Sequence, residues 1–205
     1  FGTVSVREVF HHLLPTLGSS DHPLLRQLYW RDFFTQSAFH FPKVFGNAFQ
    51  SSYNDLPWST NEQRFAAWCE GQTGFPIVDA GMRELNNTGY MHNRARMIVA
   101  SFLTKDLHVD WRWGERYFAQ RLVDYDPCVN NGSWQWAAST GCDAQPYFRI
   151  FNPWLQQKRF DVQCEYIQRW IPELRGASPT RLHRWEKEAD TSGIQGYPVP
   201  MVEHS

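Results

Sequence analysis

The chain has 205 residues, a length that suits one domain or two small ones. Hydrophobic residues make up 42% of it and charged residues 20%, a composition that supports a buried core and excludes disordered and collagen-like proteins. The 20 basic and 21 acidic residues give a net charge of −1, so nucleic acid could be bound only through a local basic patch. No apolar run approaches the roughly 20 residues of a membrane-spanning helix.

The spacing of cysteines and histidines narrows the kinds of site that the chain could hold. The four cysteines are far apart with no Cys-x-x-Cys pair, and the eight histidines include no His-x-x-x-His pair. This argues against a metal site and a disulfide framework, and it fits a reducing compartment. Because no secretory signal is seen, we expect a cytoplasmic protein, or a nuclear one in a eukaryote. The chain opens in mid-pattern, and we expect a fragment of a longer protein.

Apolar residues recur at helical spacing along most of the chain. The pattern predicts a first helix over residues 4–14, ended by Pro15 and Gly18. Asp21 can cap a second helix that has Pro23 in its first turn. Residues 41–57, with two prolines and a glycine, are predicted to be irregular. A capping-box pattern at residues 60–63 starts a third helix.

Four later helices are predicted: from Pro76 to about Gly89, over residues 91–105, from Asp110 through Leu122, and over residues 162–170. Residues 146–153 are predicted to be extended. No convincing alternation of polar and apolar residues predicts a strand. We therefore predict an all-α fold, with a helical domain over residues 1–175 and a polar C-terminal tail over residues 176–205.

Aromatic residues make up 16% of the chain, and ten of them are tryptophans. A buried indole N–H needs a partner, so a core alone seldom contains so many, whereas stacking surfaces or a bound ring system would use them. On the second predicted helix, one face carries Gln27, Trp30, Arg31 and Phe34. These residues could form a stacking platform beside a phosphate-seeking guanidinium. They could equally form a packed stripe whose arginine reaches out to water.

Two more groups of polar residues could form ligand sites, and each also has another interpretation. Asn93, Arg96 and Met97 share a face of the helix predicted over residues 91–105, and Arg94 flanks it. A polar ligand or surface salt bridges would explain them equally well. Residues 124–136 hold two aspartates, two asparagines, a glycine and two tryptophans. Paired carboxylates could serve acid–base hydrolysis, but nothing nearby completes such a site, and the aromatic residues better suit a planar ligand.

Five stretches follow one another in a recognisable order. They are Gly-Phe-Pro-Ile-Val-Asp-Ala-Gly-Met-Arg at 74–83, Gly-Tyr-Met-His-Asn-Arg-Ala-Arg-Met at 89–97, Asp-Tyr-Asp at 124–126, Asn-Asn-Gly-Ser-Trp-Gln-Trp-Ala-Ala-Ser-Thr-Gly at 130–141, and Pro-Tyr-Phe-Arg-Ile-Phe-Asn-Pro at 146–153. Together they resemble the FAD-binding helical domain of the DNA photolyase/cryptochrome family, over roughly residues 1–174. The motifs are long and mixed in composition, so chance similarity is not a serious alternative.

The resemblance implies FAD held in a U shape within the helical bundle, below a cavity that receives a damaged dinucleotide. The family's N-terminal antenna domain and its Thr-Ser-x-Leu-Ser phosphate-binding stretch do not occur in these residues, so we expect an N-terminally truncated domain. The partners implied are UV-damaged DNA and the missing portion, in the same or a separate chain, and not a membrane. A monomer is expected.

The resemblance assigns the cofactor to polar residues on three of the motif stretches. Asp124 and Asp126 match contacts to the flavin ring and the ribose, Arg96 matches the partner of Asp124, and Asn130 matches the position facing flavin N5. An arginine is needed there because a bare carboxylate would repel an anionic reduced flavin. The cofactor-binding set, completed by two residues from the faces described above, is Asp124, Asp126, Asn130, Arg96, Asn93 and Arg31.

Three tryptophans match the family's electron relay to the photoexcited flavin. Trp134 is nearest the flavin, Trp111 lies in the middle and Trp58 is outermost. Indole suits this role because its π system can be oxidised and rereduced in place. For any one of the three, core packing is the simpler alternative.

The resemblance also assigns residues to the damaged DNA. Asn93 and Met97 match the residues that cyclobutane-dimer enzymes carry where (6-4) enzymes have proton-donating histidines. Gln27 departs from the usual glutamate of the dimer enzymes, and Leu24 replaces a tryptophan of some members. The substrate-binding set is Gln27, Trp30, Arg94, Met97, Trp136, Arg149 and Gln156.

The function implied is light-dependent DNA repair by a photolyase, a carbon–carbon lyase in which photoexcited reduced FAD passes an electron to a flipped-out cyclobutane pyrimidine dimer. Three alternatives stay open: a (6-4) photolyase, a cryptochrome-type photoreceptor that keeps the flavin without repair, and a remnant that binds little.

Overall fold

The computed structural model describes residues 4–142, 150–189 and 194–204, and every regular element in them is helical. Within these residues a single β-bridge joins Ser59 to Val109. The all-α prediction is therefore confirmed. No helix among the described residues is long and apolar enough to span a membrane.

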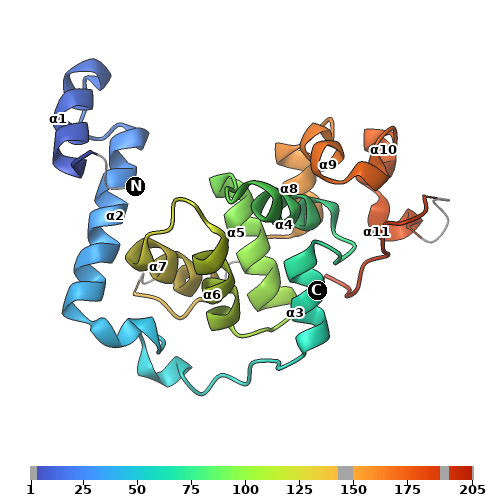
Figure 1. Cartoon of the computed structure of the whole chain (residues 1–205), viewed down its shortest axis with the longest axis horizontal. Coiled ribbons are helices and arrows are strands. Elements are labelled where there is room, and N and C mark those ends of the chain that lie inside the picture. Colours follow the sequence, from blue (N-terminus) through green and yellow to red (C-terminus); the bar gives the residue numbers. More distant parts are fainter. Residues whose placement is uncertain (1–3, 143–149, 190–193, 205) are drawn as a thin grey trace.

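The helices fall into three groups along the molecule (Figure 1). At one end, α1 (Val6–Leu17) and α2 (Pro23–His40) form a hairpin, which the short helical turns η1 (Pro42–Phe45) and η2 (Ser51–Tyr53) follow. The body contains α3 (Glu62–Glu70), α4 (Pro76–Thr88), α5 (Asn93–Ser101), the π-helical turn η3 (Phe102–Asp106), α6 (Trp111–Arg121), α7 (Pro127–Ala138), α8 (Pro153–Phe160) and α9 (Glu165–Trp170). At the other end lie η4 (Pro172–Leu174), α10 (Pro179–Leu182) and α11 (Trp185–Glu188), and the chain then returns to the body beside α3 (Figure 1).

In the hairpin, the predicted end of the first helix is confirmed in part, and the predicted cap of the second was wrong. Helix α1 continues through Pro15 but ends at Gly18, as predicted, whose φ of 68° permits the left-handed cap. Helix α2 is capped by His22, because Pro23 fixes the first helical position and the residue before it becomes the N-cap. Asp21 instead forms an exposed ion pair with Arg26 at 2.7 Å.

Other predicted ends are confirmed where a side chain or a glycine caps the helix. Asn61, within the predicted capping box, accepts from the backbone N–H of Arg64 at the start of α3. Helix α4 begins at Pro76 and ends at Gly89, and Asp110 caps α6. The helix predicted over residues 91–105 is α5 continued by the π-helical turn η3.

Four helices were missed, and one was predicted too long. Helix α7 begins within residues 124–136, which drew attention for their chemistry rather than for their spacing. Helix α8 begins at Pro153, the last residue of the stretch predicted to be extended, of which residues 146–149 lie outside the described residues. Helices α10 and α11 lie in the segment predicted to be a polar tail. Helix α9 starts only at Glu165, because the Asp161 carboxylate accepts from the backbone N–H groups of Tyr166 and Ile167.

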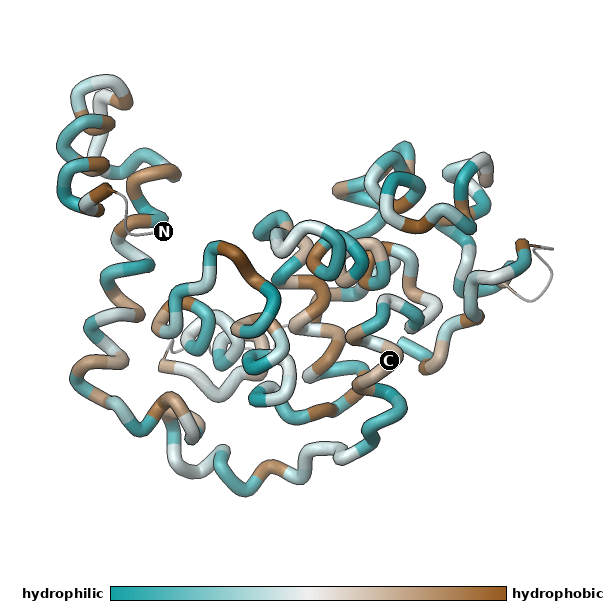
Figure 2. Tube along the Cα trace, viewed as in Figure 1, coloured by the Kyte–Doolittle hydropathy of each residue, from teal (hydrophilic) through white to brown (hydrophobic). Residues whose placement is uncertain are grey.

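The core lies between α4, α5, α6 and α7. Hydrophobic residues follow α5 through the middle of the molecule (Figure 2). The largest fully buried side chains are Trp68, Trp111, Trp134, Trp185, Phe75 and Phe102. Several of the tryptophans thus serve the core itself, and the surplus of aromatic residues is partly a packing feature.

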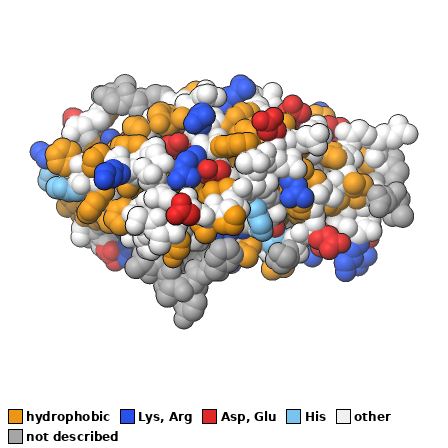
Figure 3. Space-filling view, turned by 90° about the horizontal axis from the view of Figure 1, so that it is seen from below, with side chains coloured by type: hydrophobic (Ala, Val, Ile, Leu, Met, Phe, Trp, Pro, Cys, Tyr) orange, Lys and Arg blue, Asp and Glu red, His pale blue; other side chains and the backbone are white. Residues whose placement is uncertain are grey.

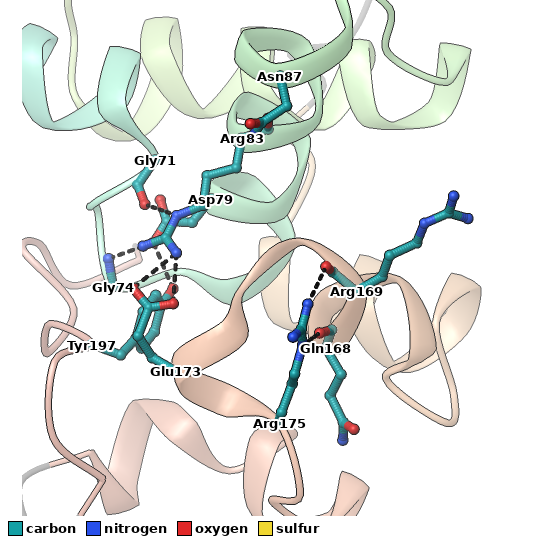
Figure 4. A network of polar contacts seen from close by, with 10 residues as sticks. All are labelled: Gly71, Gly74, Asp79, Arg83, Asn87, Gln168, Arg169, Glu173, Arg175 and Tyr197. Carbon is teal, nitrogen blue, oxygen red and sulfur yellow. Dashed lines mark hydrogen bonds and ion pairs between the residues drawn. The ribbon is translucent and has the colours of Figure 1, made fainter.

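The segment after residue 175 packs onto the body, although its composition is polar. Leu182, Trp185 and Tyr197 are buried in the core. The Tyr197 hydroxyl donates to the fully buried carboxylate of Asp79 on α4, which also accepts from Thr73 (Figure 4). The domain boundary at residue 175 stays a prediction, but this segment is part of one packed unit.

Arg83 links helix α4 to the turn η4, which contains Glu173 (Figure 4). Its guanidinium pairs with Glu173 at 2.8 Å and donates from Nε to the carbonyl of Gly71 at 3.0 Å. The Tyr197 ring lies 5.9 Å from the centre of this guanidinium. Helix α4 is therefore the anchor to which the last part of the chain is fastened.

Replacing Tyr197 with phenylalanine should destabilise the fold, and more so as the pH rises. Burial raises the pKa of Asp79, and hydrogen bonds from Thr73 and Tyr197 lower it. A raised folded-state pKa means that stability is greatest below the unfolded value of 3.8 and falls as the pH rises through the folded value. Loss of the hydroxyl removes a donor to the ionised form, at a cost of about 1–3 kcal/mol.

Thermal unfolding of Tyr197→Phe at about pH 5 and about pH 8 measures this dependence. The deficit against the parent should be larger at the higher pH. Tyr53→Phe, at an exposed position, is the control and should match the parent. An equal deficit at both pH values would contradict the role assigned to the hydroxyl.

Candidate functional site

Two arginines from different helices meet the loop that joins α6 to α7. Arg96 of α5 pairs with Asp124, with Nη2 2.9 Å from Oδ2. Arg31 of α2 pairs with Asp126, with Nη2 3.4 Å from Oδ2. Side chains that are far apart in sequence therefore converge on residues 124–126.

The Arg96 guanidinium is held from three directions. Besides pairing with Asp124, it donates from Nε to the carbonyl of Met91 at 2.7 Å and lies 5.3 Å from the Tyr90 ring centre. The side chains of the ion pair are 26% and 33% exposed, so its net contribution to stability is closer to that of a surface pair than of a buried one. Its main effect is to fix the orientation of the Asp124 carboxylate.

Asp126 performs a structural task that the sequence interpretation missed. Its Oδ1 accepts from the backbone N–H groups of Cys128 and Val129, both at 3.0 Å, and thereby caps α7. The Asp-Pro pair at 126–127 is a normal helix start and could have been recognised. The carboxylate retains further acceptor capacity, because each oxygen has two lone pairs.

Buried amides on α7 attach it to its neighbours. The Asn130 Nδ2 donates to the backbone carbonyl of Glu115 on α6 at 3.0 Å. Asn131 and Gln135 both donate to the carbonyl of Val44, at 3.1 and 3.0 Å, and so fix the turn that follows α2. At the other end of α7, Lys105 donates to the Ala138 carbonyl at 3.1 Å.

The exposed face of α5 carries three of the predicted residues. The Asn93 amide lies 3.8 Å from the Met97 sulfur, so these two side chains are neighbours. The Arg94 guanidinium lies 4.6 Å from the ring centre of Phe160 on α8. Gln156, also on α8, is partly buried, with its Oε1 buried and without a partner among the described residues. Arg149 lies outside the described residues.

Helix α2 presents an aromatic cluster. Trp30 is 50% exposed, and its ring centre lies 5.6 Å from that of Phe33 and 5.9 Å from that of Phe34. Gln27 is exposed one turn earlier. Trp136 on α7 is half-buried and packs against Phe151 at 5.9 Å. Trp30 and Trp136, the two tryptophans of the predicted substrate-binding set, thus stand on neighbouring helices.

Basic side chains do not form one large patch among the described residues on the face shown in Figure 3. On the face shown in Figure 3, lysines and arginines are interspersed with aspartates and glutamates, and hydrophobic side chains lie among them. This agrees with the net charge of −1, and any attraction for an anion must come from a few local residues.

The three predicted relay tryptophans differ in burial. Trp134 is 2% exposed and Trp111 is 1% exposed, whereas Trp58 is half-buried. The backbone N–H of Ser59, next to Trp58, donates to the carbonyl of His108 at 2.7 Å, which brings Trp58 toward the start of α6. The indole N–H groups of Trp58 and Trp111 are buried without a partner among the described residues.

Trp134 is seated against α6 by a glycine. A Cβ atom added to Gly114 would lie 2.2 Å from Cη2 of Trp134, so the indole rests directly on the helix backbone. Phe118 and Trp68 enclose it, with ring centres 5.0 and 6.0 Å away. Gly114 and Trp68 were not singled out from the sequence, because a close contact between helices has no signature in spacing.

The chain is similar to DNA photolyases in both sequence and structure. The family model for the FAD-binding domain of DNA photolyase matches residues 24–205. A deoxyribodipyrimidine photo-lyase of Vibrio cholerae is 53% identical over 182 residues, which are 88% of this chain and 38% of that protein. The crystal structure of the archaeal photolyase of Sulfolobus tokodaii, which holds two FAD molecules, has a TM-score of 0.90 and 50% identity, covering 98% of this chain and 45% of that one.

A cryptochrome is also similar. The crystal structure of the Synechocystis cryptochrome has a TM-score of 0.86 and 40% identity, covering 98% of this chain and 44% of that one. The chain spans less than half the length of the relatives that it matches.

Proposed function

This chain belongs to the DNA photolyase/cryptochrome family, and we propose that it is the FAD- and lesion-binding part of a light-dependent DNA-repair enzyme, a carbon–carbon lyase. The observation that carries the proposal is the convergence of Arg31 and Arg96 on residues 124–126. This convergence joins α2, α5 and α7 at a polar site beside the half-exposed Trp30.

The residues present fit FAD. The donor set proposed to hold it is Arg31, Asn93, Arg96, Asp124, Asp126 and Asn130. Each carboxylate of the set has its own guanidinium, so the site adds little net charge of its own beside an anionic flavin. When bound, FAD supplies light absorption and one-electron chemistry. The protein's part is to orient it and to keep Asp124 paired.

Replacing Arg96 with alanine should weaken FAD retention. Asp124 would lose its counter-charge beside an anionic ring, and because the pair is partly exposed we expect a loss of about 1–3 kcal/mol rather than that of a fully buried pair. This corresponds to roughly a 5- to 150-fold rise in Kd for FAD, measured by the absorbance of flavin against protein during dialysis. Arg26→Ala removes an Arg–Asp pair elsewhere and serves as the control. Equal retention by both variants would remove the cofactor role from Arg96.

Trp58, Trp111 and Trp134 are proposed to carry electrons inward from the surface. The greater exposure of Trp58 supports its place at the outer end, because Trp111 and Trp134 are both enclosed. Close packing fixes these two enclosed indoles and excludes water from them, so little reorganisation would accompany oxidation and rereduction.

Trp134→Phe should sharply slow the light-driven reduction of bound FAD by an external donor. Phenylalanine keeps an aromatic ring against Gly114, but its ring cannot be oxidised at the potentials that oxidise an indole. Absorbance at the flavin band under illumination follows the rate. Repair by chemically pre-reduced protein should largely survive, since it does not use the relay. A variant that photoreduces like the parent would show that the relay is misassigned.

The lesion is proposed to lie between Trp30 and Trp136. Extracting a base from the duplex costs a few kcal/mol, and stacking on aromatic rings returns part of it. Asn93, Met97 and Gln27 offer amide and thioether contacts to the lesion. The DNA backbone is proposed to be bound by Arg94, Arg149 and Gln156.

We predict that the intact enzyme containing this domain splits cyclobutane pyrimidine dimers and leaves (6-4) photoproducts unrepaired. A (6-4) lesion needs a proton donor at its transferred hydroxyl, and neither Asn93 nor Met97 carries a titrating proton. Gln27→Glu should preserve or improve dimer repair. The measurement is illumination of fully reduced protein with two oligonucleotides, each containing one lesion.

Two outcomes of that measurement would change the proposal. Repair of the (6-4) strand alone would overturn the substrate. Repair of neither, with FAD bound, would favour a photoreceptor, the second candidate that the similarity to the Synechocystis cryptochrome supports.

We also propose what completes the FAD site, which partner the protein binds and where it acts. The portion that the relatives contain beyond this span, in the same or a separate chain, would complete the FAD site. UV-damaged DNA is the proposed partner, and the proposed state is a monomer in the cytoplasm, or in the nucleus of a eukaryote.

A further inference from the structure

Gly132 marks the place where α2 lies directly against the backbone of α7. A Cβ atom added there would fall 2.1 Å from Cδ1 and 2.8 Å from Cγ of Phe34 on α2. Carbon atoms in contact need about 3.5–4.0 Å, so any other residue would displace the ring or the helix. The cavity bordered by Phe34 and Gly132 has a volume of about 20 Å³, enough for about one water molecule and too small to receive the ring.

A displacement of Phe34 would be passed on to Trp30. The two rings are one helical turn apart on α2, with centres 5.9 Å apart and planes inclined by 31°. Phe33 contacts both rings edge-on, at 5.6 and 5.5 Å. The three rings therefore move as one cluster.

The second proposed stacking residue stands on the other helix of this contact. Trp136 lies four residues after Gly132, on the same face of α7, and packs against Phe151. Among the described elements, α2 packs on α7, on α1 and on the turn η1 that follows it. The separation of α2 from α7 at Gly132 consequently fixes how far Trp30 stands from Trp136.

We propose that Gly132 is a positioning residue that sets the width of the slot between Trp30 and Trp136. The proposal rests on the proposed function, because it requires these two indoles to flank the flipped-out dinucleotide. A gap of about 0.5–1 Å already forfeits a quarter to a half of a dispersion contact, so a small shift of α2 would weaken stacking on the lesion. Contacts to the DNA backbone would be unaffected, since Arg94 and Gln156 lie on α5 and α8.

The test compares Gly132→Ala with the parent in the intact, FAD-loaded enzyme in the dark. Binding is measured to a duplex with one cyclobutane dimer and to the same duplex without it. The Kd for the dimer duplex should rise about tenfold or more, while the Kd for undamaged DNA changes by less than about twofold. Gly46→Ala is the matched control, because an added Cβ there meets nothing within 4 Å, and both affinities should stay at the parent's values.

A second background tests the route through the phenyl ring. In Phe34→Ala protein the obstacle is gone, so adding Gly132→Ala should change the dimer Kd by less than about twofold. If Gly132→Ala alone does not fold, Phe34→Ala carries the test. Removing the ring frees Trp30, and dimer binding should weaken while binding of undamaged DNA does not.

The outcomes separate this proposal from the proposed function. Unchanged dimer affinity of Gly132→Ala, or equal weakening toward both duplexes, would overturn the spacing role. Trp30→Ala and Trp136→Ala are measured alongside. If neither weakens dimer binding, the lesion contacts themselves are wrong; if both do and Gly132→Ala does not, only the spacing role fails.

Discussion

The structure depends on α7 being fixed by opposite charges at its two ends. The Asp126 carboxylate caps its N-terminus and pairs with Arg31, while the Lys105 ammonium donates to the carbonyl of Ala138 at its C-terminus. Both charges have the sign that the helix dipole favours. Burial lowers the pKa of Lys105 to about 8, so the ammonium form relies on these carbonyl and hydroxyl acceptors. Because α7 carries Asn130, Trp134 and Trp136, the proposed cofactor, relay and lesion contacts all follow its position.

The sides of α7 are shaped by glycines that admit aromatic rings. Gly132 lets Phe34 of α2 reach the backbone of α7, and Gly114 lets Trp134 reach the backbone of α6. A ring that is packed against the backbone of a neighbouring helix has little freedom to move, because the backbone, unlike a side chain, cannot change rotamer to make room. The abundance of aromatic residues thus has two origins. Some rings are locked between helices, and others, such as Trp30, stand half-exposed on a rigid base.

Local signals in the sequence were sufficient for several helix boundaries but not for contacts across the chain. Asn61 and Asp110 cap helices through neighbouring N–H groups, so their roles can be predicted from a few residues. The Asp79–Tyr197 contact joins residues 118 positions apart, and a polar composition concealed it. A helix face identified Arg31, and a motif stretch identified Asp126 separately. That they pair depends on how α2 packs against α7, which in turn depends on a glycine with no spacing pattern of its own.

The arginines proposed to shape the cofactor site and those proposed to bind the DNA backbone have different partners. Arg31 and Arg96 face carboxylates, so their charge is balanced within the protein and serves to orient Asp126 and Asp124. Arg94 and Arg159 instead lie against the ring of Phe160, at 4.6 and 5.2 Å, and form no ion pair within the described residues. A guanidinium on an aromatic face keeps its positive charge available to phosphate. Arg94 and Arg159 on the α5–α8 side therefore keep a charge that no carboxylate of the described residues balances, which is what the proposed contacts to the DNA backbone require in a chain whose net charge is −1.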